Sequence, residues 1–148
     1  MRTVEESVIV NVPVDVAYAT WANYIIFPSI TGHVILAERI TRRLSHWIIE
    51  IMGYRFDFEA LIDQLKPNKF ISWHSVTNIH HLGSVSFKPD AGRTLVTLRI
   101  MFDTEDLATD LADDLDILWP ELKKIFKEAL NSFKLYVEQM WWQVPGVV

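Results

Sequence analysis

The chain has 148 residues, of which 50% are hydrophobic and 12% aromatic, a composition that excludes a disordered protein and is long enough to bury a core without disulfides. It carries 14 Lys and Arg residues against 19 Asp and Glu residues, and the formal charge of −5 argues against a general nucleic-acid binder, which needs a basic surface. It has no cysteine, which excludes disulfides, thiol chemistry and thiolate metal sites.

The N-terminal part predicts one strand followed by two short helices. Thr3–Val12 is rich in valine and isoleucine, as strands are. Pro13 suits the first turn of a helix, and apolar residues then recur at helical spacing as far as Trp21. Asn23 ends this helix, and Tyr24–Ile30 predicts a second short helix or turn.

The middle of the chain predicts an antiparallel sheet. Apolar and polar residues alternate there, and turn residues separate the alternating segments. The expected strands are His33–Thr41, Ser45–Met52, Tyr54–Leu65, Lys69–Thr77, His80–Lys88 and Arg93–Asp103. Because the connections between them are short, neighbouring strands should pair antiparallel.

The alternation assigns the side chains of this sheet to two faces. One face collects most of the aromatic and aliphatic residues: Phe56, Phe58, Ala60, Ile62, Ile71, Trp73, Ser75, His81, Gly83, Val85, Phe87, Val96, Leu98, Ile100 and Phe102. The other face carries charged, Ser, Thr and His residues, among them Arg55, Asp57 and His74. This pattern is typical of an antiparallel sheet covered on one side.

A long amphipathic helix over Pro120–Trp141 is the expected cover. Its apolar residues form a broad stripe: Leu122, Ile125, Phe126, Ala129, Leu130, Phe133, Tyr136, Val137 and Met140. Pro120 fits a first helical position. The preceding segment, Leu107–Leu118, also has helical spacing and predicts either a separate lid-like helix or a kinked extension of the long one.

Several motifs resemble the START-like (SRPBCC, Bet v 1-like) superfamily, in particular its polyketide cyclase/dehydrase and coenzyme Q-binding branch. They are Val12–Tyr18 (VPVDVAY), Trp21–Tyr24 (WANY), Phe27-Pro28, Ile71–Ser75 (ISWHS), Gly83–Pro89 (GSVSFKP), Gly92–Leu98 (GRTLVTL) and Leu130–Glu138 (LNSFKLYVE). The order of these motifs spans nearly the whole chain. The sequence departs from the branch in the acidic segment Asp103–Asp116, in the apolar end from Trp141 onward, and at His74, where the branch usually has arginine.

The resemblance implies an α+β helix-grip fold over residues 1–148 as a single domain. Its seven-stranded antiparallel sheet, in β-α-α-β6-α order, would curve around the C-terminal helix. Such folds commonly enclose a cavity for a lipid, quinone, polyketide or other hydrophobic ligand, and need no metal or nucleotide cofactor. The expected ligand-binding residues are Trp47, Phe56, Phe58, Trp73, Ser75, His81, Val85, Phe87, Leu98, Ile100, Trp119, Leu122, Phe126 and Leu130. The residues alone leave open whether these side chains line a cavity or simply fill a core.

His81 and Ser75 are the candidate catalytic residues. An inward His81 near Ser75 would orient a ligand carbonyl or act as a general acid or base. The alternative is a histidine at the end of a strand, near the Thr77–His80 turn, that is exposed or hydrogen-bonded. The functional alternatives are therefore a binding or carrier protein, a polyketide aromatase/cyclase or dehydratase, and an assembly module that docks through its Trp-rich end. The histidines lack a recognisable ligand spacing, so no metal site is expected.

Two further segments have open interpretations. Asp103–Asp116 holds seven acidic residues, which would either bind a cation or form a solvated helix face. Trp141 and Trp142 would either form a homodimer contact or a membrane-surface patch, or place one ring on the sheet edge with the other partly exposed. The N-terminus lacks a signal-peptide apolar region and no apolar run spans a membrane, which predicts a cytoplasmic protein without an integral membrane segment.

Overall fold

The computed structural model describes residues 2–103 and 109–142, with side chains described outside 109–115. A seven-stranded antiparallel sheet has the order β1-β7-β6-β5-β4-β3-β2. Its strands are β1 (Arg2–Val10), β2 (Val34–Arg39), β3 (Leu44–Ile51), β4 (Tyr54–Lys66), β5 (Phe70–Ser75), β6 (His81–Asp90) and β7 (Arg93–Phe102). Strands β2 to β7 pair in chain order, as the short connections predict, and β1 returns to pair with β7 over its whole length.

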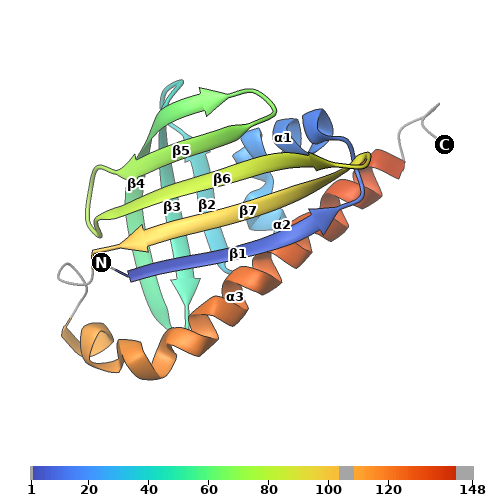
Figure 1. Ribbon diagram of the computed structural model, residues 1–148. Helices are drawn as coiled ribbons and strands as arrows, with labels where there is room; N and C mark the ends of the chain where they lie inside the picture. The colour runs from blue at the N-terminus through green and yellow to red at the C-terminus, as the bar shows by residue number, and fades with distance from the viewer. Residues whose placement is uncertain (1, 104–108, 143–148) are drawn as a thin grey trace.

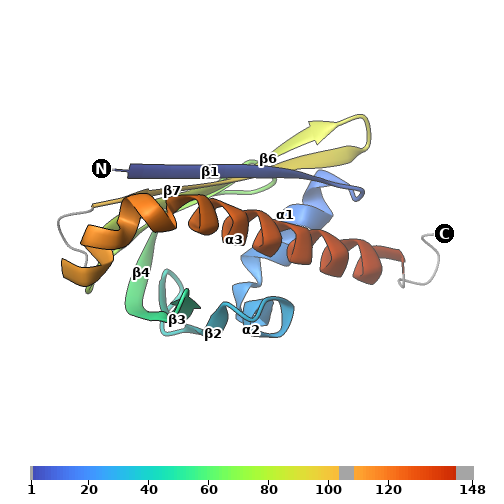
Figure 2. The same cartoon turned by 90° about the horizontal axis from the view of Figure 1, so that it is seen from below.

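The sheet curls around one long helix. Helix α3 (Thr109–Trp142) runs along the open side of the curled sheet, with β1, β6 and β7 on one side of it and β2 and β3 on the other (Figures 1 and 2). The amphipathic stripe explains this position, because α3 buries Leu130, Phe133 and Val137 against the inner face of the sheet. The expected α+β helix-grip fold is confirmed.

Helix α3 differs from the sequence-based expectation at its start. It begins at Thr109 and continues through Pro120, so the segment expected as a separate helix or kinked extension is the first part of α3. Figure 2 shows this first part turned relative to the rest of the helix. A proline inside a helix lacks the N–H of one backbone hydrogen bond, which accounts for a bend there. Residues 107 and 108 of the expected Leu107–Leu118 helix lie outside the described residues.

The other strand and helix bounds differ from the expected ones by only a few residues. The largest shifts are two residues and occur at four strands: β1 ends at Val10 instead of Val12, β2 at Arg39 instead of Thr41 and β5 at Ser75 instead of Thr77, while β6 extends through Pro89 to Asp90. That extension shortens the expected Pro89–Gly92 turn to Ala91 and Gly92. Both residues have positive φ, as a two-residue hairpin turn requires.

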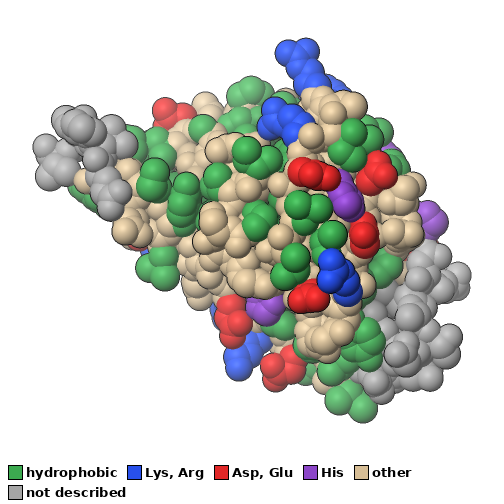
Figure 3. Space-filling view, turned by 180° about the vertical axis from the view of Figure 1, so that it is seen from behind, with side chains coloured by type: hydrophobic (Ala, Val, Ile, Leu, Met, Phe, Trp, Pro, Cys, Tyr) green, Lys and Arg blue, Asp and Glu red, His purple; other side chains and the backbone are tan. Residues whose placement is uncertain are grey.

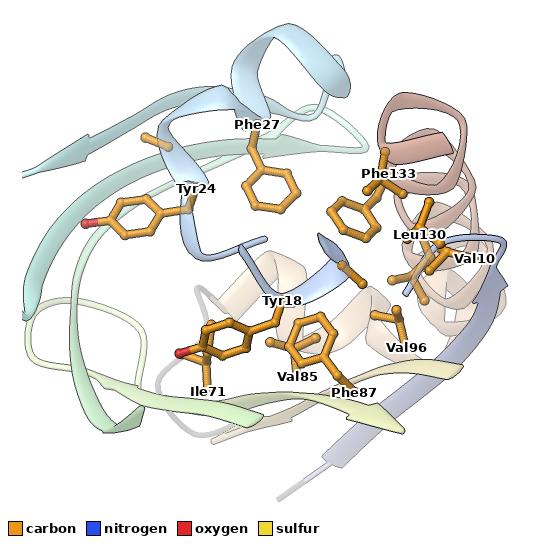
Figure 4. Packing of buried hydrophobic residues seen from close by; sticks show 14 residues of the cluster. Val10, Tyr18, Tyr24, Phe27, Ile71, Val85, Phe87, Val96, Leu130 and Phe133 are labelled. Atoms are coloured by element: carbon orange, nitrogen blue, oxygen red, sulfur yellow. The ribbon is translucent and has the colours of Figure 1, made fainter. Parts of the chain in front are cut away.

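Three short helical segments close one end of the curled sheet. They are α1 (Val14–Ala22), the 3-10 turn η1 (Tyr24–Ile26) and α2 (Phe27–Ile30). Figure 4 shows Phe27 and Phe133 directed towards each other from α2 and α3, and Tyr18 beside Phe87. The ring centroids of Tyr18 and Phe87 are 5.5 Å apart in an edge-to-face arrangement. This end of the molecule is a solid core.

Candidate ligand-binding cavity

A cavity of about 260 Å³ lies between the inner face of the sheet and the first half of α3. Ten of the expected ligand-binding residues line it: Trp47, Phe56, Phe58, Trp73, His81, Leu98, Ile100, Trp119, Leu122 and Phe126. They come from β3, β4, β5, β6, β7 and α3. Strand alternation places the sheet residues on one face, and helical spacing turns the α3 residues towards that face.

The remaining four expected residues lie elsewhere. Val85, Phe87 and Leu130 belong to the solid core, where the side chains of α1, α2 and the second half of α3 fill the space above the sheet. Ser75 is buried next to β6. Its Oγ accepts a hydrogen bond from the backbone N of His81 at 2.9 Å. Ser75 therefore fixes the start of β6 and does not line the cavity.

Sequence reasoning missed a second part of the wall. Trp21, Tyr24, Phe27, Thr31 and His33 line the cavity from α1, η1, α2 and the connection to β2. No alternating or helical pattern links these residues to the sheet face, so only the tertiary structure reveals them. Ala60, Ile62, Ile71, Phe102, Ile125 and Ala129 also line the cavity; the sequence places them on the inner face or in the helix stripe without predicting ligand binding. The remaining lining residues are Ala22, Val34, Ser45, Ile49, Ile51, Met52, Tyr54, Leu65 and Ile79. Ile49 and Ile51 alternate with Trp47 on β3, and that signal was available in the sequence.

His81 points into the cavity wall and is 7% exposed. Its Nε2 accepts a hydrogen bond from Trp73 Nε1 at 3.3 Å, and its Nδ1 lies 3.4 Å from the backbone O of Ile79. This arrangement requires the tautomer with the proton on Nδ1. Burial lowers the pKa of His81 below its usual value, and the hydrogen bond to Ile79 opposes that effect only in part. His81 is therefore a neutral imidazole at neutral pH.

Trp73 reaches His81 because residue 83 is a glycine. Trp73 and Gly83 are directly paired on β5 and β6. A Cβ atom on Gly83 would lie 2.2 Å from two carbon atoms of the Trp73 indole, closer than any real contact. Gly83 thus lets the indole lie flat on β6 beside His81, two residues earlier on the same face.

Trp47 is oriented in a similar way on the other side of the cavity. Its Nε1 donates a hydrogen bond to Ser45 Oγ at 2.8 Å, and Ser45 is on the same face of β3. Ser45 in turn donates to the backbone O of Ala60 at 3.3 Å. Both indole N–H groups are satisfied within the wall, which leaves the rings themselves as the surface facing the cavity.

The sequence is similar to that of a known protein family. Residues 10–115 match the model of the family described as polyketide cyclase / dehydrase and lipid transport. The chain belongs to this family. It is also 30% identical to an uncharacterized 17.2 kDa protein of Streptomyces lincolnensis, over 99% of this chain and 96% of that protein.

Solved structures of this family's fold include proteins with assigned activities. The chain matches the Zhui aromatase/cyclase from Streptomyces sp. R1128 with a TM-score of 0.81 and 19% identity, over 99% of both chains. It matches the di-domain aromatase/cyclase StfQ of the steffimycin biosynthetic pathway with a TM-score of 0.69 and 18% identity, over 93% of this chain and 51% of StfQ. It matches a START superfamily protein from Mycobacterium smegmatis with a TM-score of 0.67 and 14% identity, over 93% of this chain and 95% of that protein. At these identities the likeness shows the fold alone.

The outer face of this family member's sheet carries its polar side chains. Figure 3 shows acidic, basic and histidine side chains interspersed over part of the side that holds β2 and β3. His46 lies between Asp57 and Glu38, with ring nitrogens 2.7 Å and 3.2 Å from their carboxylates. Hydrogen bonds from the His46 ring to these carboxylates, to Asp57 above all, raise the pKa of His46. No sequence pattern predicts these contacts, because they join residues on β2, β3 and β4.

Within residues 2–103 and the described side chains of 116–142, no three His, Cys, Asp or Glu residues are arranged to hold a metal ion. Most of the acidic segment Asp103–Asp116 lies outside the described side chains, so its two interpretations stay open. The described helices include none with the length and apolarity to cross a membrane.

The two tryptophans at the end of α3 differ in environment. Trp141 is partly buried and packs against the solid core, whereas Trp142 is 53% exposed. The alternative in which one ring packs and the other is partly exposed matches this arrangement. A homodimer contact through this end stays a prediction, with Trp142 as its exposed surface.

Proposed function

We propose that residues 1–148 act as one START-like domain that binds a hydrophobic small molecule, such as a lipid, quinone or polyketide, for transport or sequestration. The observation that carries this proposal is the apolar cavity of about 260 Å³ between the sheet and α3. Its volume is close to the lower end of ligand pockets, which span about 300–1,000 Å³. An apolar cavity holds water poorly, so an apolar ligand gains free energy by filling it.

Native mass spectrometry and direct titration test this proposal. The purified protein is titrated with 1-decanol, a short-chain ubiquinone and an anthraquinone, and binding is followed by tryptophan fluorescence. Trp21, Trp47, Trp73 and Trp119 all line the cavity, so a bound ligand changes their emission. Failure of every probe to bind, together with no ligand retained in native mass spectra, would contradict the proposal.

A cavity-filling variant locates the binding. Ala129 lies on α3 and lines the cavity, so Ala129→Phe would place a ring in the space for the ligand. We expect this variant to remain folded and to lose most of its affinity. Ala19→Phe is the matched control, because Ala19 is an exposed position on α1 away from the cavity. Equal affinities of the two variants would place the ligand elsewhere.

An aromatase/cyclase or dehydratase activity is the second candidate. It is supported by the neutral imidazole of His81 in the cavity wall, a group that can accept or deliver a proton. The His81 ring contacts an indole N–H and a backbone carbonyl rather than the carboxylate or hydroxyl that would mark an activated base. Binding without catalysis is therefore favoured. If His81→Gln abolished conversion of a poly-β-ketone thioester while leaving its affinity unchanged, catalysis would be the better account.

A further inference from the structure

The cavity wall carries no formal charge among the residues that the structure describes. Its lining consists of aliphatic and aromatic residues together with Thr31, Ser45, His33 and His81, and none of the lining residues is Asp, Glu, Lys or Arg. Other charged side chains lie on the outer face of the sheet, where His46 contacts both Glu38 and Asp57. A ligand inside the cavity therefore faces no counter-ion.

Of the two histidines of the wall, His81 offers no positive charge in this arrangement. The Nε2 atom of His81 accepts a hydrogen bond from the Trp73 indole N–H, which only an unprotonated nitrogen can do. The ring centroids of Phe58 and Phe102 lie 4.7 Å and 6.3 Å from that of His81. His33 directs its Nδ1 towards the backbone O of Glu50 at 3.3 Å. Both imidazoles are thus held by neutral partners.

Two arginines contact residues of the wall. The Arg2 guanidinium lies 4.3 Å above the Trp119 ring, and its Nη1 contacts Asp116 at 2.5 Å. The Arg39 guanidinium lies 5.5 Å from the Tyr24 ring centroid. Each arginine contacts a residue that lines the cavity without being a lining residue itself. Neither supplies a cation to a ligand within the cavity.

We propose that the cavity selects uncharged hydrophobic ligands and excludes their carboxylate counterparts. This inference rests on the proposed binding function and narrows its ligand class: fatty alcohols, esters, quinones and neutral polycyclic aromatics fit, whereas fatty acids and other anionic amphiphiles do not. The physical reason is the cost of burying an unpaired ion. That cost far exceeds the cost of burying a hydroxyl or carbonyl group, which needs one hydrogen bond or none.

A pair of probes that share one carbon chain tests the selection. The full-length protein is titrated with 1-decanol and with decanoate at pH 7.5, below the micelle concentration of decanoate, with tryptophan fluorescence as the readout. Methyl 2-naphthoate and 2-naphthoate form a second pair, followed by equilibrium dialysis. We expect the neutral member of each pair to bind at least about tenfold more tightly, because the anion must lose its hydration without gaining a partner.

The outcomes separate this inference from the function on which it rests. Equal affinities, or tighter binding of the anions, would overturn the selection for uncharged ligands and leave the binding function intact. If no member of either pair binds, both the selection and the binding function are overturned.

A charge placed in the wall gives an independent check. Ala129→Lys puts an ammonium group at the cavity, and lysine is a good helix former at this partly exposed position on α3. We expect the preference for 1-decanol over decanoate to fall at least about tenfold or to reverse, because the anion now has a counter-ion. The matched control Ala19→Lys should keep the wild-type preference. An unchanged preference in a folded Ala129→Lys protein would count against the inference.

Discussion

Gly83 determines how closely Trp73 lies on the sheet. We expect Gly83→Ala to cost about 1–3 kcal/mol of unfolding free energy, because the new methyl group overlaps the Trp73 indole. The displaced indole also loses its hydrogen bond to His81, so tryptophan fluorescence and near-UV circular dichroism should change. Urea unfolding measures the cost. The control is Gly32→Ala, since a Cβ on Gly32 meets nothing within 4 Å. Equal stability of the two variants would contradict this role for Gly83.

His81 should make the stability of the protein depend on pH. Because its folded-state pKa is lowered, the unfolded chain binds a proton below about pH 6.5 that the folded protein does not bind. The stability that neutral His81 contributes is therefore lost as the pH falls from 6.5 towards the folded pKa, by at most about 1.4 kcal/mol per pH unit. Urea unfolding between pH 7.5 and 5 measures this effect. We expect the free energy of unfolding of the wild type to decrease relative to that of His81→Gln as the pH falls.

His46 provides a control with the opposite sign. Its folded pKa is raised by Asp57 and Glu38, so the stabilisation from the protonated ring is fully present below pH 6.5 and is lost as the pH rises through the folded pKa. The free energy of unfolding of the wild type should therefore increase relative to that of His46→Gln as the pH falls. If the free energies of unfolding of the two variants, relative to the wild type, changed with pH in the same way, the opposite pKa shifts of His81 and His46 would be contradicted.

The alternation of residues predicts which face a side chain occupies but not what lies above it. Val85 and Phe87 share a face of β6 with His81, and all three are buried. The space above Val85 and Phe87 is filled by α1 and α3, whereas the space above His81 is hollow. Whether an inner-face residue of β6 belongs to the core or to the cavity wall depends on its position along the strand. The sequence alone does not predict this, because the answer depends on where the helices lie over the strand.

At the scale of elements, a Lys134–Glu138 pair holds α3 against the end of β1. Glu138 Oε2 accepts hydrogen bonds from the Lys134 Nζ at 2.6 Å and from the backbone N of Asn11 at 2.8 Å. Lys134 Nζ also donates to the backbone O of Ile9 at 2.9 Å. Both side chains are less than one third exposed, so solvent screens this pair less than an ordinary surface ion pair.

Removal of this carboxylate should therefore loosen the contact between helix and strand. We expect Glu138→Ala to lower the free energy of unfolding by about 1–3 kcal/mol, since two hydrogen bonds to a charged group are lost. The change in the urea midpoint measures it. Glu128→Ala on the exposed face of α3 is the matched control and should stay within about 0.5 kcal/mol of the wild type. A similar small effect for Glu138→Ala would mean that this contact contributes little to stability.

The sequence predicts the existence and type of these elements better than their bounds. The strands β2 to β7 and the amphipathic stripe of α3 follow from residue periodicity, and β1 follows from its valine and isoleucine content. The start of α3 does not, because proline is common at the first position of a helix and Pro120 reads as such a start. The structure continues the helix back to Thr109 and tolerates the missing hydrogen bond with a bend.

The whole molecule has a solid end and a hollow end along the same helix. Leu130, Phe133 and Val137 on the second half of α3 are at most 1% exposed and belong to the solid core. Trp119, Leu122 and Ile125 on the first half line the cavity. A hollow region has fewer apolar contacts for its size, so its backbone hydrogen bonds should open at lower free-energy cost.

Hydrogen exchange should reveal this asymmetry and its dependence on ligand. In the free protein we expect peptides from residues 130–140 to exchange more slowly than peptides from residues 119–129. Saturation with 1-decanol should slow exchange in 119–129 and in the facing strand residues 47–58, because the ligand supplies the missing contacts, and should leave 130–140 nearly unchanged. Exchange followed by mass spectrometry of peptic fragments measures both effects. Uniform protection along α3, or a ligand effect confined to 130–140, would show that the two ends do not differ in the way the cavity implies.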